Sequence, residues 1–194
     1  KNFKYIMTCS GAHKFLLEKG LKPNQFVQWT QCDLDPRKHK ITMLGEPQYG
    51  IEYLIASTVH PNYFDAFKPD HNVKLWHIFA DESAGAAVLP RGEYLVTGGS
   101  SIGLRLITLA ALKGFKDMHF FGFDGNFGKS GTHAADHPNS PKEEFETEYG
   151  GKKYKTTPSM AFVAKETFKE LNQMPSVKAT FYGEGLTQAM AKDY

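Results

Sequence analysis

The sequence predicts an α/β protein with a Rossmann-like fold, in which a doubly wound, mostly parallel sheet carries helices on both faces. Short runs of β-branched and aromatic residues alternate with helical patterns along most of the chain, as in successive βαβ units. The run 118–121 is apolar on both faces, which is typical of a strand buried in a parallel sheet. We expect the 194 residues to form a single domain.

The first half of the chain contains four predicted strands. They cover residues 3–9, 26–30, 53–57 and 73–79. A short helix is expected over 12–19 because Gly20 ends it, and Pro61 suits the first turn of another helical segment. His60 follows a strand end, whereas His77 falls inside an apolar run and is expected to be a core or packing residue.

A glycine loop joins the next predicted strand, 94–97, to a helix that ends before Gly114. The loop residues are Gly98, Gly99, Ser100 and Ser101, and either serine can cap the helix. Such a loop exposes unpaired backbone N–H groups at the positive end of the helix, which favours an anion such as phosphate. The alternative is that the glycines serve only tight packing of the helix against the strand.

Asp124 follows the strand 118–121 and would lie at the carboxyl edge of the sheet. Ligands of open α/β sheets bind at this edge, so Asp124 is a candidate catalytic or ligand-binding residue. As an alternative, its side chain could simply cap the turn at Gly125.

Residues 125–151 have no apolar period and are expected to form a long loop or lid. His133 in this loop is a candidate general base for an acceptor hydroxyl. The alternatives are a metal ligand acting with His137 and a surface histidine without a role. The predicted elements after this loop are a strand over 152–157, a helix over 159–172 and a strand over 177–182.

Asp33 and Asp35 form a D-x-D pattern after the second predicted strand. Two carboxylates at this spacing can hold a divalent ion such as Mg²⁺ that bridges a nucleotide diphosphate. Aspartates in a turn before Pro36 are also ordinary, so a purely structural role is the alternative.

The composition excludes some classes of partner. The net charge is only +2 and the lysines are scattered, so nucleic acid is not an expected partner. No apolar run approaches the roughly 18 residues of a membrane helix and no signal peptide is recognisable, so we expect a cytoplasmic protein without a membrane span. Cys9 and Cys32, near strand ends, are expected to be buried, reduced thiols.

Several segments of the chain resemble one known family. They are F-L-L-E-K-G-L-K-P-N-Q-F-V-Q-W-T-Q-C-D, T-G-G-S-S-I-G-L-R-L-I-T-L-A-A-L-K-G-F-K-D-M-H-F-F-G-F-D, G-T-H-A, and K-T-T-P with A-T-F-Y-G-E-G-L. Together they resemble the MptE-like proteins, which include archaeal 6-hydroxymethylpterin diphosphokinases and bacterial motility-associated flagellin glycosyltransferases. The resemblance spans nearly the whole chain and implies a Rossmann-like domain that binds a nucleotide.

Two departures from the pattern limit what the resemblance implies. Family members have a G-x-G-P-S-L loop upstream of the equivalent of Phe3, and we expect this chain to lack that N-terminal glycine-loop strand. A bacterial sialyltransferase family of similar architecture places a histidine base just before the helix that starts here at Pro158. This chain has Thr156 and Thr157 at that place, so such a mechanism would need another base.

The leading expectation is a transferase that takes a small-molecule nucleotide donor, most plausibly a nucleotide sugar of the CMP-nonulosonate type, and passes the activated group to a hydroxyl acceptor. The glycine loop would hold phosphate, Asp33 and Asp124 would hold ribose, metal or acceptor, and His133 would be the base. The second expectation is a 6-hydroxymethylpterin diphosphokinase-like enzyme, which transfers pyrophosphate from ATP and needs Mg²⁺. The third is a nucleotide-binding domain without catalytic activity.

Overall fold

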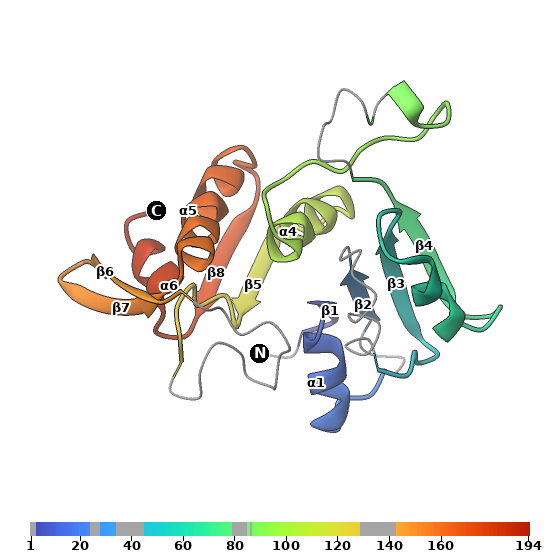
Figure 1. Cartoon of the computed structure of the whole chain (residues 1–194), viewed down its shortest axis with the longest axis horizontal. Coiled ribbons are helices and arrows are strands. Elements are labelled where there is room, and N and C mark those ends of the chain that lie inside the picture. Colours follow the sequence, from blue (N-terminus) through green and yellow to red (C-terminus); the bar gives the residue numbers. More distant parts are fainter. Residues whose placement is uncertain (1–2, 24–27, 34–44, 79–84, 86, 129–142) are drawn as a thin grey trace. The chain divides into compact units, whose positions relative to one another are not determined.

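The computed structural model describes residues 3–23, 28–33, 45–78, 85, 87–128 and 143–194 (Figure 1). The chain divides into two compact units, Lys1–Thr97 (unit 1) and Gly98–Tyr194 (unit 2). Each unit is described by itself. The described residues form a mixed α/β structure with a four-stranded parallel sheet and two two-stranded sheets. The expected single domain stays a prediction.

Unit 1 is built on the four-stranded parallel sheet, whose strands lie side by side in chain order. They are β1 (Tyr5–Cys9), β2 (Gln28–Asp33), β3 (Ile51–Ala56) and β4 (Asn72–Trp76). The central strands β2 and β3 are almost entirely buried, as parallel strands with neighbours on both sides must be. Four of the strands predicted from the sequence are therefore confirmed, with ends shifted by a few residues.

One face of this sheet is covered by a short helix, α1 (Ala12–Glu18), and a 3-10 helix, η2 (Pro61–Ala66). The side chain of His13 from α1 packs edge-on against the ring of Tyr53 in β3. Tyr63 from η2 is buried and donates a hydrogen bond to Asp33 of β2. Tyr53 pairs with Gln31 in the β2–β3 register, and Asp33 lies two residues beyond Gln31 on the same strand. Asp33 and Tyr53 therefore point to the same side of the sheet. Both helical segments therefore cover the same face.

The described residues of unit 2 form three helices, a parallel strand pair and a hairpin. The elements are α4 (Ile102–Leu112), β5 (Asp117–Phe121), β6 (Phe145–Tyr149), β7 (Lys152–Thr156), α5 (Pro158–Asn172), β8 (Lys178–Tyr182) and α6 (Leu186–Met190). Strands β5 and β8 pair in parallel, and the rings of Phe120 and Phe181 stack between them at 4.6 Å. The helix expected between the glycine loop and Gly114 and the helix expected over 159–172 are confirmed.

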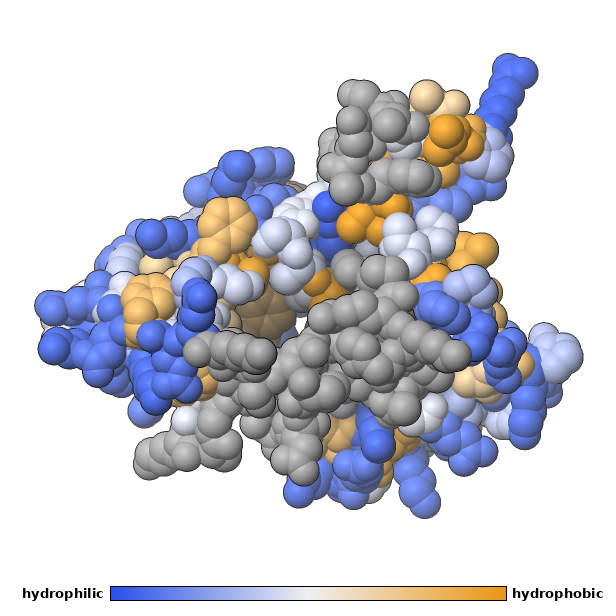
Figure 2. All heavy atoms as spheres, viewed as in Figure 1, coloured by the Kyte–Doolittle hydropathy of each residue, from blue (hydrophilic) through white to orange (hydrophobic). Residues whose placement is uncertain are grey.

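The antiparallel hairpin β6–β7 corrects part of the expected long loop over 125–151. Along residues 145–149, Phe145, Thr147 and Tyr149 alternate with two glutamates, and the turn residues Gly150 and Gly151 both have positive φ, at 58° and 73°. This backbone is the one that a two-residue hairpin turn requires, and glycine adopts it without strain. Tyr154 of β7 packs with α5 and α6, whereas hydrophilic side chains cover the outer surface of the hairpin (Figure 2).

The predicted strand 94–97 is also corrected. Only Leu95 makes a β-bridge, with His77, and no ladder extends on either side. Because β4 ends at Trp76, no strand within the described residues pairs with the rest of this segment. The expected βαβ unit around α4 is thus reduced to its helix and the strand β5.

No helix in the described part of the chain is long and apolar enough to cross a membrane. Both cysteines are free thiols, and Cys9 faces Cys32 across the β1–β2 ladder. Burial, followed by the nearby charge of Asp33, raises the pKa of the Cys9 thiol to about 12. Cys9 therefore stays protonated at neutral pH.

Candidate functional site

The glycine loop lies at the N-terminus of α4 in unit 2, and close packing requires both of its glycines. Gly98 and Gly99 have φ values of 107° and 51°, a region that favours glycine. A Cβ added at Gly98 would lie 2.2 Å from the Thr108 hydroxyl oxygen, and one at Gly99 would lie 2.3 Å from the buried side chain of Leu104. Both glycines are therefore required for tight packing of the loop against α4, and the alternative that they serve only packing stays a prediction.

The same loop also binds anionic groups, which are two carboxylates of α5. The backbone N–H of Gly99 donates to Glu170 at 3.2 Å, and the backbone N–H of Ser100 donates to Glu166 at 3.0 Å. The Ser100 hydroxyl makes a second, short hydrogen bond to Glu166. Ser101 has the capping role predicted for it, since its side chain accepts from the N–H of Leu104 at 3.3 Å. The positive end of the helix dipole favours negative groups at this place.

Glu166 and Glu170 were not among the residues singled out from the sequence. They lie one turn apart on α5, an arrangement in which like charges repel and destabilise an isolated helix. In the folded unit each carboxylate meets a backbone N–H group of the loop, which offsets that repulsion. Two acids at this spacing on one helix are the only sequence signal of such a contact.

Asp124 lies three residues beyond the end of β5, in a turn between Gly122 and Gly125. One carboxylate oxygen, Oδ1, accepts a hydrogen bond from the side chain of Gln188 at 3.0 Å. Its backbone carbonyl accepts from the N–H of Thr187 at 3.0 Å. Asp124 thus ties the end of β5 to α6, while its second oxygen, Oδ2, has no hydrogen-bond partner in the described part of the chain.

The residues that follow Asp124 reinforce this tie. The side-chain oxygen of Asn126 accepts from the N–H of Leu186 at 2.8 Å, and the hydroxyl of Thr156 donates to the carbonyl of Gly125 at 2.7 Å. Thr157 caps α5 by accepting from the N–H of Met160 at 3.1 Å. The carboxyl ends of β5 and β8 therefore carry a fixed cluster of polar groups around one free carboxylate oxygen.

Asp33 lies at the carboxyl end of β2, as expected, but its side chain is only 1% exposed. It accepts a hydrogen bond from the Tyr63 hydroxyl at 3.0 Å. Burial, and then the charge of Asp33, raises the pKa of Tyr63 far above its usual range, so this phenol keeps its proton and remains a donor. The carboxylate of Asp33 is thus held in the core of unit 1.

Two of the predicted site residues, Asp35 and His133, lie outside the described residues, as does His137. Within the described ranges, no three His, Cys, Asp or Glu side chains converge on a point that could hold a metal ion. The predicted Mg²⁺ site at Asp33 and Asp35 and the catalytic role of His133 stay predictions.

The histidines of unit 1 differ from expectation in one case. His60 accepts a hydrogen bond from the N–H of Asn62 at 3.2 Å and so caps η2. His77, expected to be a core or packing residue, comes one residue after β4 ends and is not in the core, since its side chain is 19% exposed. In unit 2, His119 packs against Tyr182, whose hydroxyl lies 3.0 Å from Nδ1.

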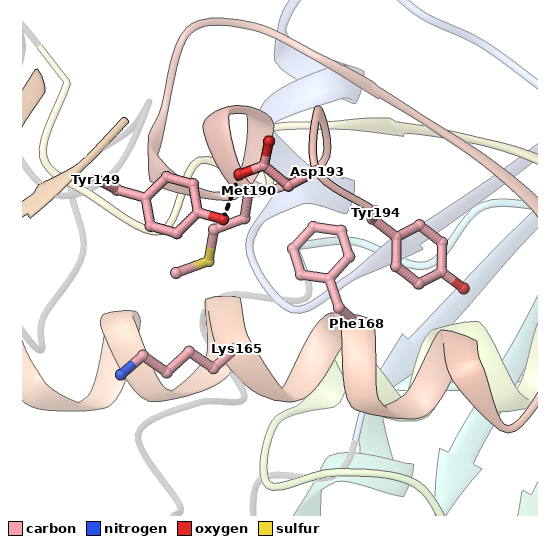
Figure 3. Close-up of a pocket in the computed structure, with 6 residues that line it drawn as sticks. All are labelled: Tyr149, Lys165, Phe168, Met190, Asp193 and Tyr194. Atoms are coloured by element: carbon pink, nitrogen blue, oxygen red, sulfur yellow. Dashed lines mark hydrogen bonds between the residues drawn. The ribbon is translucent and has the colours of Figure 1, made fainter. Parts of the chain in front are cut away.

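Unit 2 also contains a shallow pocket of about 360 Å³ away from these residues. It is lined by Tyr149, Lys165, Phe168, Met190, Asp193 and Tyr194 (Figure 3). The Tyr149 hydroxyl donates to Asp193 at 2.7 Å on one rim, and the Phe168 and Tyr194 rings lie 5.2 Å apart. Its lining suits a small apolar or aromatic group, but none of the residues predicted from the sequence reaches it.

Comparison of the chain with models of protein families, with curated proteins and with solved structures found no match. The likeness to the MptE-like family therefore stays a resemblance of short motifs.

Proposed function

We propose that this chain is a nucleotide-dependent transferase that holds a phosphate group of its donor at the loop Gly98–Ser101. The observation that carries the proposal is the pair of carboxylates already hydrogen-bonded to this loop, Glu166 at Ser100 and Glu170 at Gly99. The loop donors face negatively charged oxygens, and a phosphate group presents oxygens of the same kind with more charge.

Phosphate would enter by replacing the two carboxylates. In the ligand-free protein they satisfy the loop N–H groups, and they repel each other because they lie one helical turn apart. An incoming phosphate accepts from Gly99, Ser100 and the Ser100 hydroxyl in their place, and the two glutamate side chains rotate toward solvent. The carboxylates thus act as internal competitors whose strength sets the nucleotide affinity.

The donor in this proposal is a nucleotide sugar and the acceptor is a hydroxyl group, as the sequence motifs indicate. Oδ2 of Asp124 has no partner in the described ranges and is the group proposed to bind a ribose or acceptor hydroxyl. His133 keeps its proposed role as general base. The doubly wound Rossmann-like arrangement also belongs to this proposal, because parallel pairing of β1–β4 and of β5 with β8 is what such a fold contains.

Calorimetric titration with CMP, UDP, GDP and ATP, each with and without Mg²⁺, tests the proposal. At least one nucleotide should bind the parent protein, and the double variant Glu166→Gln, Glu170→Gln should bind it about tenfold more tightly. A tenfold gain corresponds to about 1.4 kcal/mol, the scale of the difference between the charged and the neutral hydrogen bonds that the ligand must displace.

The matched control is the double variant Glu146→Gln, Glu148→Gln, which removes the same charge from the exposed hairpin of unit 2. It should bind the nucleotide like the parent protein, with at most a small, salt-dependent gain. The proposal fails if no nucleotide binds to the parent or to the loop variant. An equal gain in both double variants would assign the effect to net charge and not to the loop.

A further inference from the structure

Three polar side chains of unit 1 form a hydrogen-bonded series where β3 and β4 end. Ser57 is the first residue after β3, and His77 is the first after β4. The hydroxyl oxygen of Ser57 lies 3.0 Å from Nδ1 of His77. On the other side of the ring, Nε2 of His77 makes a short contact with the carboxylate of Glu93.

Backbone pairing places each of the three residues. The β3–β4 register sets Ala56 opposite Trp76, and the N–H of Ser57 donates to the Trp76 carbonyl at 2.8 Å, so Ser57 and His77 leave the sheet side by side. The segment that carries Glu93 is fixed by the β-bridge between Leu95 and His77. The N–H of Val96 also donates to the His77 carbonyl, at 2.8 Å.

The contacts assign a role to each ring nitrogen of His77. A carboxylate can only accept, so Glu93 holds the proton on Nε2. In the neutral imidazole Nδ1 then carries the lone pair, so the Ser57 hydroxyl that faces it is the donor. The arrangement resembles a serine–histidine–acid triad, in which a carboxylate orients the imidazole that acts on the serine. Here Nδ1 faces the serine and Nε2 faces the carboxylate, the reverse of the usual triad.

Of the three residues, the serine is open to solvent and the histidine is the most shielded. Ser57 is exposed. The His77 side chain is 19% exposed and that of Glu93 is 46% exposed. A substrate can therefore reach the serine oxygen, while the imidazole is largely shielded and held on both sides.

We propose that Ser57, His77 and Glu93 form a second site, which cleaves small activated carboxylic esters through an acyl-serine. The Ser57 oxygen attacks the ester carbonyl as its proton passes to Nδ1 of His77. The tetrahedral intermediate collapses, the C–O bond to the leaving group breaks, and the departing alcohol takes the proton from Nδ1. Water then attacks the acyl-serine, again losing a proton to Nδ1, which returns it to Ser57 as the carboxylic acid leaves.

The open position of Ser57 at the sheet edge sets the substrate class. Small acyl groups with good leaving groups are favoured, because they demand little from surrounding groups for binding or for stabilising the oxyanion. This site lies wholly within unit 1 and does not depend on the proposed nucleotide site in unit 2.

The first test uses a fluorophosphonate probe on the full chain, with intact-mass measurement and peptide mapping. The serine displaces fluoride and forms one covalent phosphonate ester per molecule. We expect the label on Ser57, and this mapping needs no variant. Absence of a label, or a label on another serine, overturns the proposal.

The second test follows release of p-nitrophenol from p-nitrophenyl acetate. Ser57→Ala should abolish the acyl-enzyme seen by intact mass, and His77→Gln should slow its formation by roughly 100-fold, the usual scale for loss of a general base. Ser176→Ala, at an exposed serine in the turn before β8, is the matched control and should acetylate at the parent rate. Equal acetylation of the parent, Ser57→Ala and Ser176→Ala proteins would show ordinary surface reactivity and would sink the idea.

Discussion

Glu170 of α5 accepts a hydrogen bond from the backbone N–H of Gly99 at 3.2 Å, although 71 positions separate the two residues in the sequence. The next loop residue, Ser100, is held in the same way by Glu166. The loop in front of α4 is therefore fixed from two directions, by side chains of α4 packed beneath the glycines and by carboxylates of α5 bonded to the N–H groups. Substitutions that add side-chain volume to the loop should therefore lower the stability of the protein. Substitutions that remove the charge of the α5 carboxylates should change the affinity of the loop for anions.

Gly99→Ala should destabilise the protein strongly. The new Cβ would lie 2.3 to 2.5 Å from carbons of Leu104, which is fully buried, and φ is 51°. Overpacking and the left-handed backbone together should lower the free energy of unfolding by about 2 to 4 kcal/mol, measured by urea denaturation. Gly114→Ala is the control for backbone strain alone, because its φ is 90° and no atom lies within 4 Å of the added Cβ. Equal losses in the two variants would refute the packing contact.

Tyr63→Phe should destabilise the protein more than Tyr149→Phe does. Both phenols donate to an aspartate, but Tyr63 and Asp33 are buried in unit 1, whereas the Tyr149–Asp193 pair is exposed. Removing a donor from a buried carboxylate costs about 1 to 3 kcal/mol, whereas an exposed bond contributes little. Thermal unfolding of the two variants measures the difference. A Tyr63→Phe protein as stable as the parent would mean that the Asp33 carboxylate does not depend on this phenol.

His13 should make the protein less stable in mild acid. The residue is fully buried against Trp29 and Tyr53, and burial lowers its pKa from 6.5 to about 4. Between these two values the unfolded chain binds a proton that the folded chain does not, so stability falls as the pH drops from about 6.5 to 4 and levels off below. The full loss is on the order of 3 kcal/mol, from about 1.4 kcal/mol for each pKa unit.

The measurement is urea unfolding of the parent and of His13→Phe at pH 7 and pH 5. The phenylalanine ring keeps the edge contacts with Trp29 and Tyr53 but cannot titrate. The difference in stability between the two pH values should therefore be smaller in the variant. An unchanged difference would show that His13 titrates normally in the folded protein.

The elements that the sequence predicted well are those with a strong local signal. The strand β3 has an apolar run and the helices α4 and α5 have helical spacing, with a serine or threonine at each helix start. The hairpin β6–β7 had an equally local signal, an aromatic or β-branched residue at every second position leading into Gly150–Gly151. This signal was missed because the residues before it in the predicted loop 125–151 show no apolar period.

The candidate sites were less predictable because they depend on contacts between distant segments. His77 lies in an apolar run, and only the end of β4 at Trp76 turns it toward Ser57. The partners of the glycine loop come from α5, which nothing in the sequence of the loop specifies. By contrast, the position of Asp33 at a strand end was predicted correctly, but its burial depends on Tyr63, thirty positions further on.

Two substitutions separate the structural role of Asp124 from its proposed role in ligand binding. In Asp124→Asn the side-chain carbonyl can still accept from Gln188, and the backbone carbonyl still accepts from Thr187, so the unfolding temperature should stay close to that of the parent. The second oxygen becomes an NH₂ group and loses its charge. If this oxygen binds a ribose or acceptor hydroxyl, the affinity for the nucleotide found by calorimetry, or the turnover with it, should fall by about tenfold or more. Asp124→Ala loses both the acceptor for Gln188 and the second carboxylate oxygen, so it should also lower the unfolding temperature. A parent-like affinity and turnover in Asp124→Asn, together with a destabilised Asp124→Ala, would leave Asp124 only its tie between β5 and α6.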